Sequence, residues 1–311
     1  MPLDLLGTKK KRKSMNKLLL GILLLVSICM TSCLDLAPNL FNPTQIDEYL
    51  YDDYADSEDQ LPAEYDLLAG ELTEFTVESE LDGFTNTIYG AYLGDINTIS
   101  EDTVILYCHG NSGTMDWYFQ RTKLLYNTKA KSHYGVLLFD YQGYGRSEGS
   151  PSEAALVADA NAMVNWLANQ GLTGDRLYVY GFSLGSIPAI ELNVNPKNLT
   201  PARLLLEAPI GSIDAMAEDG SGLSIPASFF ADLGTNNIEL IKSVEQPLYW
   251  IHGIADDFLA MNTHGQPIFD NHSGVFKFSE KVPDGNHGDT PFILGLEPYL
   301  ESLETFLLRK I

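Results

Sequence analysis

Short apolar segments that alternate with amphipathic segments are the feature that most constrains the fold of this chain. Runs of four to eight apolar residues between turn signals are typical of buried strands, and a period near 3.6 residues is typical of helices. Strands are predicted at 72–77, 87–93, 103–108, 135–139, 177–180, 203–206, 247–251 and 275–278, and helices at 151–169, 183–194 and 291–308. This order predicts a mostly parallel sheet with helices on both faces, in which ligands bind at the carboxyl ends of the strands.

Length and charge limit the classes of protein that fit. With 311 residues and 45% hydrophobic residues, the chain is long enough to bury a full core, and we expect one catalytic domain over 71–311. A net charge of −23 would repel nucleic-acid phosphates, so nucleic acid is not an expected partner. Of the three cysteines, Cys108 alone follows the leader, where its apolar surroundings predict a buried thiol and no disulfide.

The first 33 residues have the pattern of a secretory leader. A basic cluster precedes the apolar run 18–30, which is shorter than the roughly 20 residues that a membrane-spanning helix needs. Small residues lead to Cys33, as in the lipobox of bacterial lipoproteins, where the cysteine is lipidated. We therefore expect residues 1–33 to be a lipoprotein signal peptide and the protein to be lipid-anchored in the bacterial cell envelope. A single uncleaved membrane anchor is the alternative; both place the domain outside the cytoplasm.

An acidic, tyrosine-rich segment over 34–70 follows the leader. It lacks the apolar periodicity of a core element, so we interpret it as a tether between the lipid and the domain. Its tyrosines could instead pack on the domain as a short arm. The sequence does not separate these two possibilities.

The candidate nucleophile is Ser183, in the pattern Gly181-Phe182-Ser183-Leu184-Gly185. The pattern directly follows the predicted strand 177–180 and opens a predicted helix, which is the context of a nucleophile elbow. Two glycines allow the sharp turn in which a strained serine projects its hydroxyl away from the sheet. The five-residue pattern alone is weakly specific, and its place between strand and helix supplies the specificity.

A serine hydroxyl needs a base, and the base needs a third group that orients it. Asp256 follows the predicted strand 247–251, and His287 follows the predicted strand 275–278. In a fold with this kind of sheet, the partners of such a serine follow it along the chain in the order acid, then histidine. We expect His287 to carry the proton and Asp256, rather than its neighbour Asp257, to orient the imidazole.

The tetrahedral intermediate of such a reaction needs an oxyanion hole. One donor is expected to be the backbone N–H of Leu184, at the positive end of the helix that Ser183 opens. The second is expected from Asn111, in the glycine-containing loop that follows strand 103–108. His109, in the same loop, is interpreted as structural.

Taken together, these segments resemble the α/β-hydrolase superfamily. The resemblance rests on His109-Gly-Asn, Asp140-Tyr-Gln-Gly-Tyr-Gly-Arg-Ser-Glu-Gly149, Gly181-Phe-Ser-Leu-Gly185, His252-Gly-x-x-Asp256 and His287. It covers about 72–310 and is closest to the serine-aminopeptidase-like and Bem46-like branch. It implies an α/β-hydrolase fold with an eight-stranded sheet, no cofactor, a short cap insertion at about 211–246, and hydrolysis of an ester, thioester or amide.

The expected activity is that of a serine hydrolase, which cleaves carboxylic esters or related acyl bonds of small molecules. A short cap favours an open site for small or medium acyl groups. A peptidase that releases N-terminal residues is the alternative, with Glu207 or Asp214 as candidate binders of the substrate amine, and a non-catalytic binding protein of the same fold is a further one. Because the histidines lack the spacing and the cysteine partners of a zinc site, no metal is expected.

Overall fold

A sheet of eight strands organises the part of the chain that the structure, a computed structural model, describes: residues 41–55, 60–128, 134–212, 214–215 and 234–309. The strand order is β10-β9-β8-β7-β4-β6-β3-β2. The pairs β2·β3 and β3·β6 are antiparallel and the others are parallel. The strands of this sheet are β2 Leu72–Leu81, β3 Phe84–Leu93, β4 Thr103–Cys108, β6 Tyr134–Phe139, β7 Leu177–Phe182, β8 Arg203–Glu207, β9 Leu248–Gly253 and β10 Lys277–Val282.

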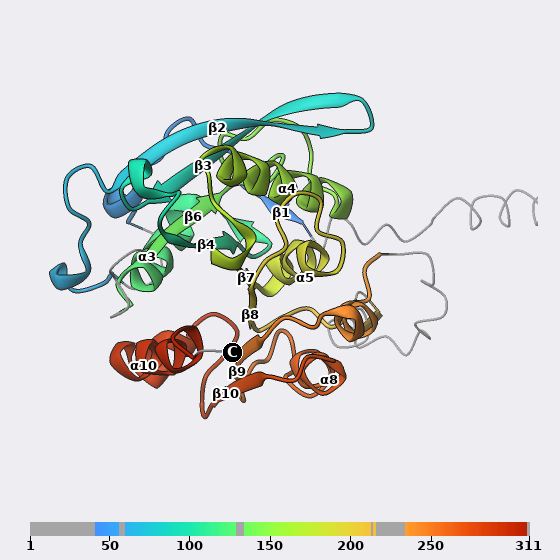
Figure 1. Ribbon diagram of the computed structural model, residues 1–311. Coiled ribbons are helices and arrows are strands. Elements are labelled where there is room, and N and C mark those ends of the chain that lie inside the picture. Colours follow the sequence, from blue (N-terminus) through green and yellow to red (C-terminus); the bar gives the residue numbers. More distant parts are fainter. Residues whose placement is uncertain (1–40, 56–59, 129–133, 213, 216–233, 310–311) are drawn as a thin grey trace, which may run out of the picture. The chain divides into compact units, whose positions relative to one another are not determined.

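Helices cover both faces of the sheet, with α3 and α10 on one face and α4, α5 and α8 on the other (Figure 1). The prediction of a mostly parallel eight-stranded sheet between two helical layers is confirmed. The helices are α3 Met115–Tyr126, α4 Glu153–Asn169, α5 Ser186–Val194, α7 Asn237–Leu240, α8 Gly265–Asn271, α9 Thr290–Leu294 and α10 Leu296–Leu307. Single 3-10 turns lie at Tyr51–Asp53, Ala63–Tyr65, Ile96–Thr98, Gly174–Arg176, Ser183–Gly185 and Ile241–Ser243.

The central strands explain the continuous apolar runs in the sequence. Every residue of β7 is buried, because helices pack on both faces of the sheet. The register aligns the carboxyl ends of the strands, with Cys108 beside Gly181 and Phe182 beside Glu207. Burial raises the pKa of the Cys108 thiol, which is free and fully buried as predicted.

Several elements differ from those expected. Helix α3 was not predicted, because polar residues, among them Gln120, Arg121 and Lys123, occupy its buried positions and obscure its apolar face. Strands β2 and β3 extend to a two-residue turn at Asp82-Gly83, where positive φ values of 52° and 80° suit a tight hairpin. The predicted closing helix is divided into α9 and α10 at Gly295.

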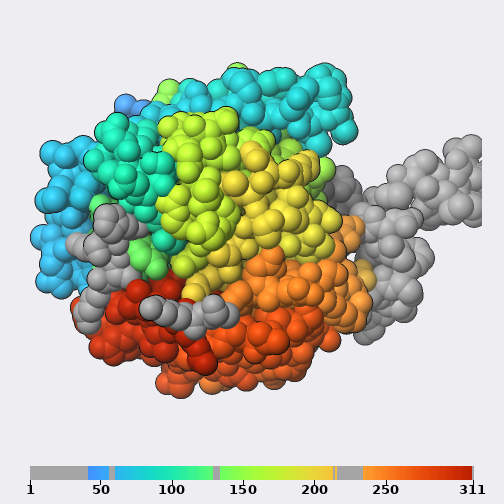
Figure 2. All heavy atoms as spheres, in the orientation of Figure 1, coloured from blue at the N-terminus to red at the C-terminus, as the bar shows by residue number. Residues whose placement is uncertain are grey.

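The described part of the acidic segment packs on the domain as an arm. Its first residues form β1, Asn42–Pro43, which pairs with β5, Ser112–Gly113. The Tyr49 hydroxyl donates to Asp140 Oδ2 at 2.7 Å, and the side chain of Tyr65 is buried. Figure 2 shows the blue and light-blue residues of this segment against one side of the domain. For residues 41–55 and 60–70, called the N-terminal arm below, the structure favours the packed arm over the free tether.

Two other expectations fall mainly outside the described residues. The signal peptide 1–33, including Cys33, is not described, nor are residues 213 and 216–233 of the cap expected at about 211–246. Within the described ranges, no helix has the length and apolar character required to span a membrane.

Candidate active site

Ser183 occupies a strained turn between β7 and α5. Its φ of 51° lies in the left-handed region, which costs free energy for a residue with a side chain. The turn brings backbone segments very close together: a Cβ on Gly185 would lie 1.9 Å from the Cys108 carbonyl oxygen, and one on Gly181 would lie 2.7 Å from the Gly185 oxygen. These two positions therefore require glycine. This is the geometry that the sequence pattern predicted for a nucleophile elbow.

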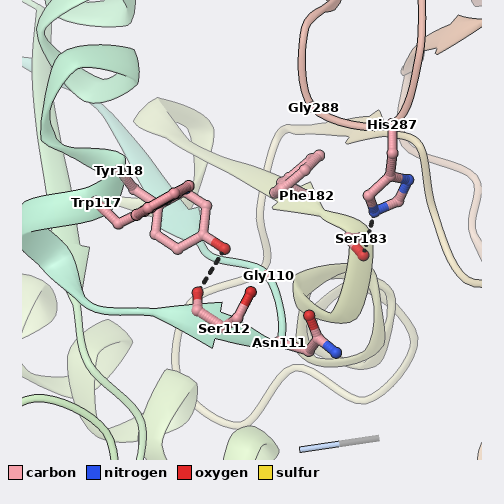
Figure 3. A pocket seen from close by; sticks show the side chains of 9 residues that line it. All are labelled: Gly110, Asn111, Ser112, Trp117, Tyr118, Phe182, Ser183, His287 and Gly288. Atoms are coloured by element: carbon pink, nitrogen blue, oxygen red, sulfur yellow. Dashed lines mark hydrogen bonds between the residues drawn. The ribbon is translucent and has the colours of Figure 1, made fainter. Parts of the chain in front are cut away.

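His287 lies within hydrogen-bond distance of Ser183 and of Asp256. Its Nε2 is 2.9 Å from Ser183 Oγ, and its Nδ1 is 2.9 Å from Asp256 Oδ2 (Figure 3 shows the contact with the serine). A carboxylate accepts only, so Nδ1 carries the proton and Nε2 is free to accept from the serine hydroxyl. The structure thus brings together the three residues that the sequence singled out, from segments up to 104 residues apart.

Asp256 is buried and held by several donors. Its Oδ1 accepts from the backbone N–H groups of Phe258 and Leu259, at 3.0 and 2.8 Å. Burial opposes its ionisation, but the hydrogen bonds from His252 and His287 outweigh that effect and hold the pKa of Asp256 below its usual range. The carboxylate therefore stays charged beside the imidazole.

His252 is a second donor to the acid, and its role was not predicted. Its Nε2 is 3.1 Å from Asp256 Oδ2 and 2.9 Å from the Leu259 carbonyl oxygen, both acceptors, so this nitrogen carries the proton. Trp250 Nε1 donates to the other ring nitrogen at 3.3 Å and fixes this tautomer. The sequence contained His252 in the quoted segment, but nothing there indicated which way its ring points.

Asp257 is not among the hydrogen-bond partners of the imidazole, which are Asp256 and Ser183. Asp257 is exposed, and its backbone N–H donates to Asn286 Oδ1 at 3.1 Å. Both carboxylates lie in the irregular loop after β9, and of the two it is that of Asp256 that contacts His287.

The loop after β4 forms the opposite wall of the site. Asn111 lines a cavity of about 310 Å³, and its carbonyl oxygen accepts from Asn42 N–H and the Tyr144 hydroxyl, both at 2.9 Å. Leu184, whose N–H was expected to be the other oxyanion donor, is buried directly after Ser183. His109 is fully buried, with Nδ1 2.8 Å from the Gly110 carbonyl oxygen, a position that suits the structural role expected for it.

The lining of the cavity is about equally polar and apolar. Figure 3 shows Trp117 and Tyr118 on one side, and Phe182, Ser183 and His287 on the other. The residues that line it are Gly110, Asn111, Ser112, Trp117, Tyr118, Phe182, Ser183, His287 and Gly288. In the described part of the chain, no three His, Cys, Asp or Glu side chains are grouped as metal ligands.

Glu207 does not face this cavity. Its side chain is fully buried, with Oε2 2.5 Å from Arg121 Nη1 and accepting from the Tyr180 hydroxyl at 2.5 Å, while Oε1 accepts from the Thr290 hydroxyl. A carboxylate paired in this way cannot bind a substrate amine. The idea that Glu207 serves as such a binder is therefore wrong.

Comparisons with known proteins agree with this architecture. A family model described as the alpha/beta hydrolase fold matches residues 103–192. The chain is 29% identical over 204 residues to alpha/beta hydrolase domain-containing protein aho-3 of Caenorhabditis elegans, covering 65% of this chain and 57% of that protein. It is 38% identical over 116 residues to the zebrafish (Danio rerio) lysophosphatidylserine lipase ABHD12, covering 37% of this chain and 30% of the lipase. The chain thus spans less than two thirds of either relative.

Among solved structures, an esterase of Pyrococcus furiosus superimposes with a TM-score of 0.64. The match covers 87% of this chain and 97% of the esterase, at 19% sequence identity. At that identity the likeness establishes the fold alone. The chain has the α/β-hydrolase fold.

Proposed function

We propose that this α/β-hydrolase-fold protein, of the serine-aminopeptidase-like and Bem46-like branch, is a serine hydrolase that cleaves carboxylic esters through an acyl-enzyme. The observation that carries the proposal is the hydrogen-bonded series Ser183, His287, Asp256, of which the serine and the histidine line a cavity. A strained serine beside an imidazole that a carboxylate orients is the arrangement that makes a hydroxyl nucleophilic.

In the proposed reaction, Ser183 Oγ attacks the ester carbonyl carbon while His287 Nε2 takes the hydroxyl proton. The oxyanion that forms accepts hydrogen bonds from the N–H groups of Asn111 and Leu184. The C–O bond to the alcohol then breaks, and the imidazolium gives its proton to the leaving oxygen. Water, deprotonated by His287, attacks the acyl-enzyme, and the serine leaves with the proton as the carboxylic acid is released.

The cavity favours an uncharged acyl or alcohol group. Trp117, Tyr118 and Phe182 supply apolar surface, and none of the described lining residues carries a carboxylate or a permanent positive charge. A substrate with a free amine would find no counter-charge there, and Glu207 is already paired with Arg121. Esters therefore fit the cavity better than the N-terminal residues of peptides.

The decisive experiment combines a fluorophosphonate probe with a panel of p-nitrophenyl esters and aminoacyl amides. Wild type is expected to be labelled at Ser183 and to hydrolyse the esters. Ser183→Ala should lose labelling and at least about 10³-fold in kcat. Ser150→Ala, at an exposed site outside the cavity, should behave like wild type. Labelling at another serine, or none in folded wild type, would favour the non-catalytic binding protein.

We also propose that Cys33 carries a lipid and that the protein acts in the bacterial cell envelope. The support is the short apolar run that ends in small residues before this cysteine. Metabolic labelling with a palmitate analogue should mark wild type and not Cys33→Ser. If the substituted protein is still labelled, the anchor lies elsewhere.

A further inference from the structure

A fully buried ion pair lies beside the candidate active site. The Arg121 guanidinium, from the middle of α3, is 2.5 Å from Glu207 Oε2 at the carboxyl end of β8, and both side chains have no exposed surface. Neither residue lines the cavity, so the pair is not available to a substrate. The role of the pair therefore depends on the segments that it contacts.

Both members of the pair bind the segment that carries His287. Arg121 Nη2 donates to the carbonyl oxygen of Gly288 at 2.5 Å, and Gly288 directly follows the histidine. Glu207 accepts from the hydroxyl of Thr290, the first residue of α9. Two of the three residues after His287 are therefore fixed to one ion pair.

The same pair contacts the strand that carries the nucleophile. The guanidinium lies 5.0 Å from the centre of the Phe182 ring, and Tyr180 donates to Glu207. Phe182 directly precedes Ser183, and its ring centre is 5.3 Å from that of His287. The pair thus connects the strand that carries the nucleophile to the segment that carries His287.

Stability alone is a weak reason for such a pair. Removing two charges from water is costly, and replacing a buried ion pair by apolar residues is often neutral or stabilising. An arginine offers a planar fork that serves a carboxylate and a carbonyl oxygen at once, whereas a lysine ammonium has no such fork. The specific gain from Arg121 is a fixed position for the Gly288 carbonyl.

We propose that Arg121 is a positioning residue for His287, acting through the Gly288 carbonyl, and that Glu207 holds Arg121 in place. The inference rests on the proposed hydrolase function, since it concerns the base of that reaction. A shift of about 1 Å in a catalytic group can cost on the order of 10²-fold in rate. The expected defect is therefore in the chemical step rather than in substrate binding.

The first test is Arg121→Lys, which keeps the charge beside Glu207 and gives up the fork. We expect kcat to fall by about 10- to 100-fold with KM within about twofold, and the rate of fluorophosphonate labelling to fall in parallel. The matched control is Arg203→Lys. Arg203 is another buried arginine that donates to a backbone carbonyl, that of Arg309 at 2.6 Å, but it lies at the opposite end of β8. Its kcat should stay within about twofold of wild type.

The second test separates positioning from folding. Arg121→Met leaves a buried carboxylate without its partner and is expected to lower the thermal midpoint, whereas Arg121→Met with Glu207→Gln removes both charges and should recover much of it. If Arg121 positions the histidine, kcat stays low in the double variant although stability returns. Recovery of kcat together with stability, or a wild-type kcat in Arg121→Lys, would overturn the inference. Failure of wild type itself to react with the probe would instead overturn the proposed function.

Discussion

The nucleophile turn and the histidine loop meet at one site but are held in different ways. In the turn, residues 181–185, backbone atoms pack so closely that two positions admit no side chain. In the histidine loop, residues 283–289, a Cβ on Gly288 would meet nothing within 4 Å. At Gly285 the loop still packs closely on Gly253, but around His287 side-chain hydrogen bonds hold it: Asn286 Oδ1 accepts from the N–H of His287 at 2.8 Å, and Asp289 Oδ1 accepts from that of Asn286 at 2.6 Å.

Because the two regions are held differently, we expect the nucleophile turn to affect stability and the histidine loop to affect catalysis. Steric packing of the backbone is part of the core, so an error in the turn should strongly destabilise the fold. Polar contacts around a half-buried loop contribute little net free energy, so an error there should leave the fold and disturb the chemistry. Substitutions in the two regions should accordingly separate stability from catalysis.

The largest effect is expected for Gly185→Ala. Its Cβ would lie 1.9 Å from the Cys108 carbonyl oxygen, and because neither backbone segment can move without disturbing the sheet, we expect a loss of about 3 kcal/mol or more in the free energy of unfolding. Urea unfolding measures it. Gly288→Ala is the matched control and should leave stability nearly unchanged. If the two variants were equally stable, the nucleophile turn and the histidine loop would not differ in how strongly their backbone packing contributes to stability.

The next effect concerns the acid. Asp256→Asn should lower kcat by about 10² to 10⁴. The amide can neither fix the tautomer of His287 nor stabilise its protonated form during the reaction. Asp257→Asn should lower kcat less than about tenfold, since that side chain is exposed. Steady-state kinetics and circular dichroism of both variants would check this. A larger loss in Asp257→Asn would reverse the assignment.

The same carboxylate predicts a pH dependence of stability. The pKa of Asp256 is lower in the folded protein than the value of about 3.9 for an unfolded chain, because its hydrogen bonds outweigh burial. Its contribution is therefore fully present above about pH 4 and is lost as the pH falls towards the folded pKa. The difference in unfolding free energy between wild type and Asp256→Asn should shrink as the pH falls below about 4. A difference that grows on acidification would contradict this.

The smallest effect is expected for Asn286→Ala in the histidine loop. It removes the acceptor for the N–H groups of His287 and Asp257, so kcat should fall severalfold, while stability falls by only about 1 kcal/mol. Asn195→Ala, at an exposed site that bonds Glu191, is the control and should alter neither quantity. A loss of stability as large as that of Gly185→Ala would show that the loop belongs to the core.

The sequence predicted those parts of the molecule whose signals are local. The strand, turn and helix around Ser183 lie within a few residues of one another, and Asp256 and His287 are found by their place after successive strands. The contacts of Arg121 could not be predicted in this way, since its partners are 86 and 167 residues away and its helix carries polar residues at buried positions. For the same reason the sequence left Glu207 as a candidate binder of a substrate amine.

The N-terminal arm was undecided for a related reason. Its acidic composition is that of a solvated segment, but the domain supplies buried partners for it. Lys123 Nζ lies 2.6 Å from Asp52 Oδ1, and Asp116 Oδ1 accepts from two backbone N–H groups of the arm, those of Leu50 and Tyr51. A composition shared with disordered segments does not reveal such distant partners.

The pairing of β1 with β5 also fixes how far the domain can move from its proposed anchor. Eight residues lie between Cys33 and Asn42, and the nine Cα–Cα steps from one to the other span about 30 Å when the chain is fully extended. Asn42 also donates to the carbonyl oxygen of Asn111, which lines the cavity. The length of chain between Cys33 and Asn42 therefore limits the distance between the lipid and the cavity. A lipid on Cys33 would thus confine hydrolysis to a thin layer of solvent next to the bilayer.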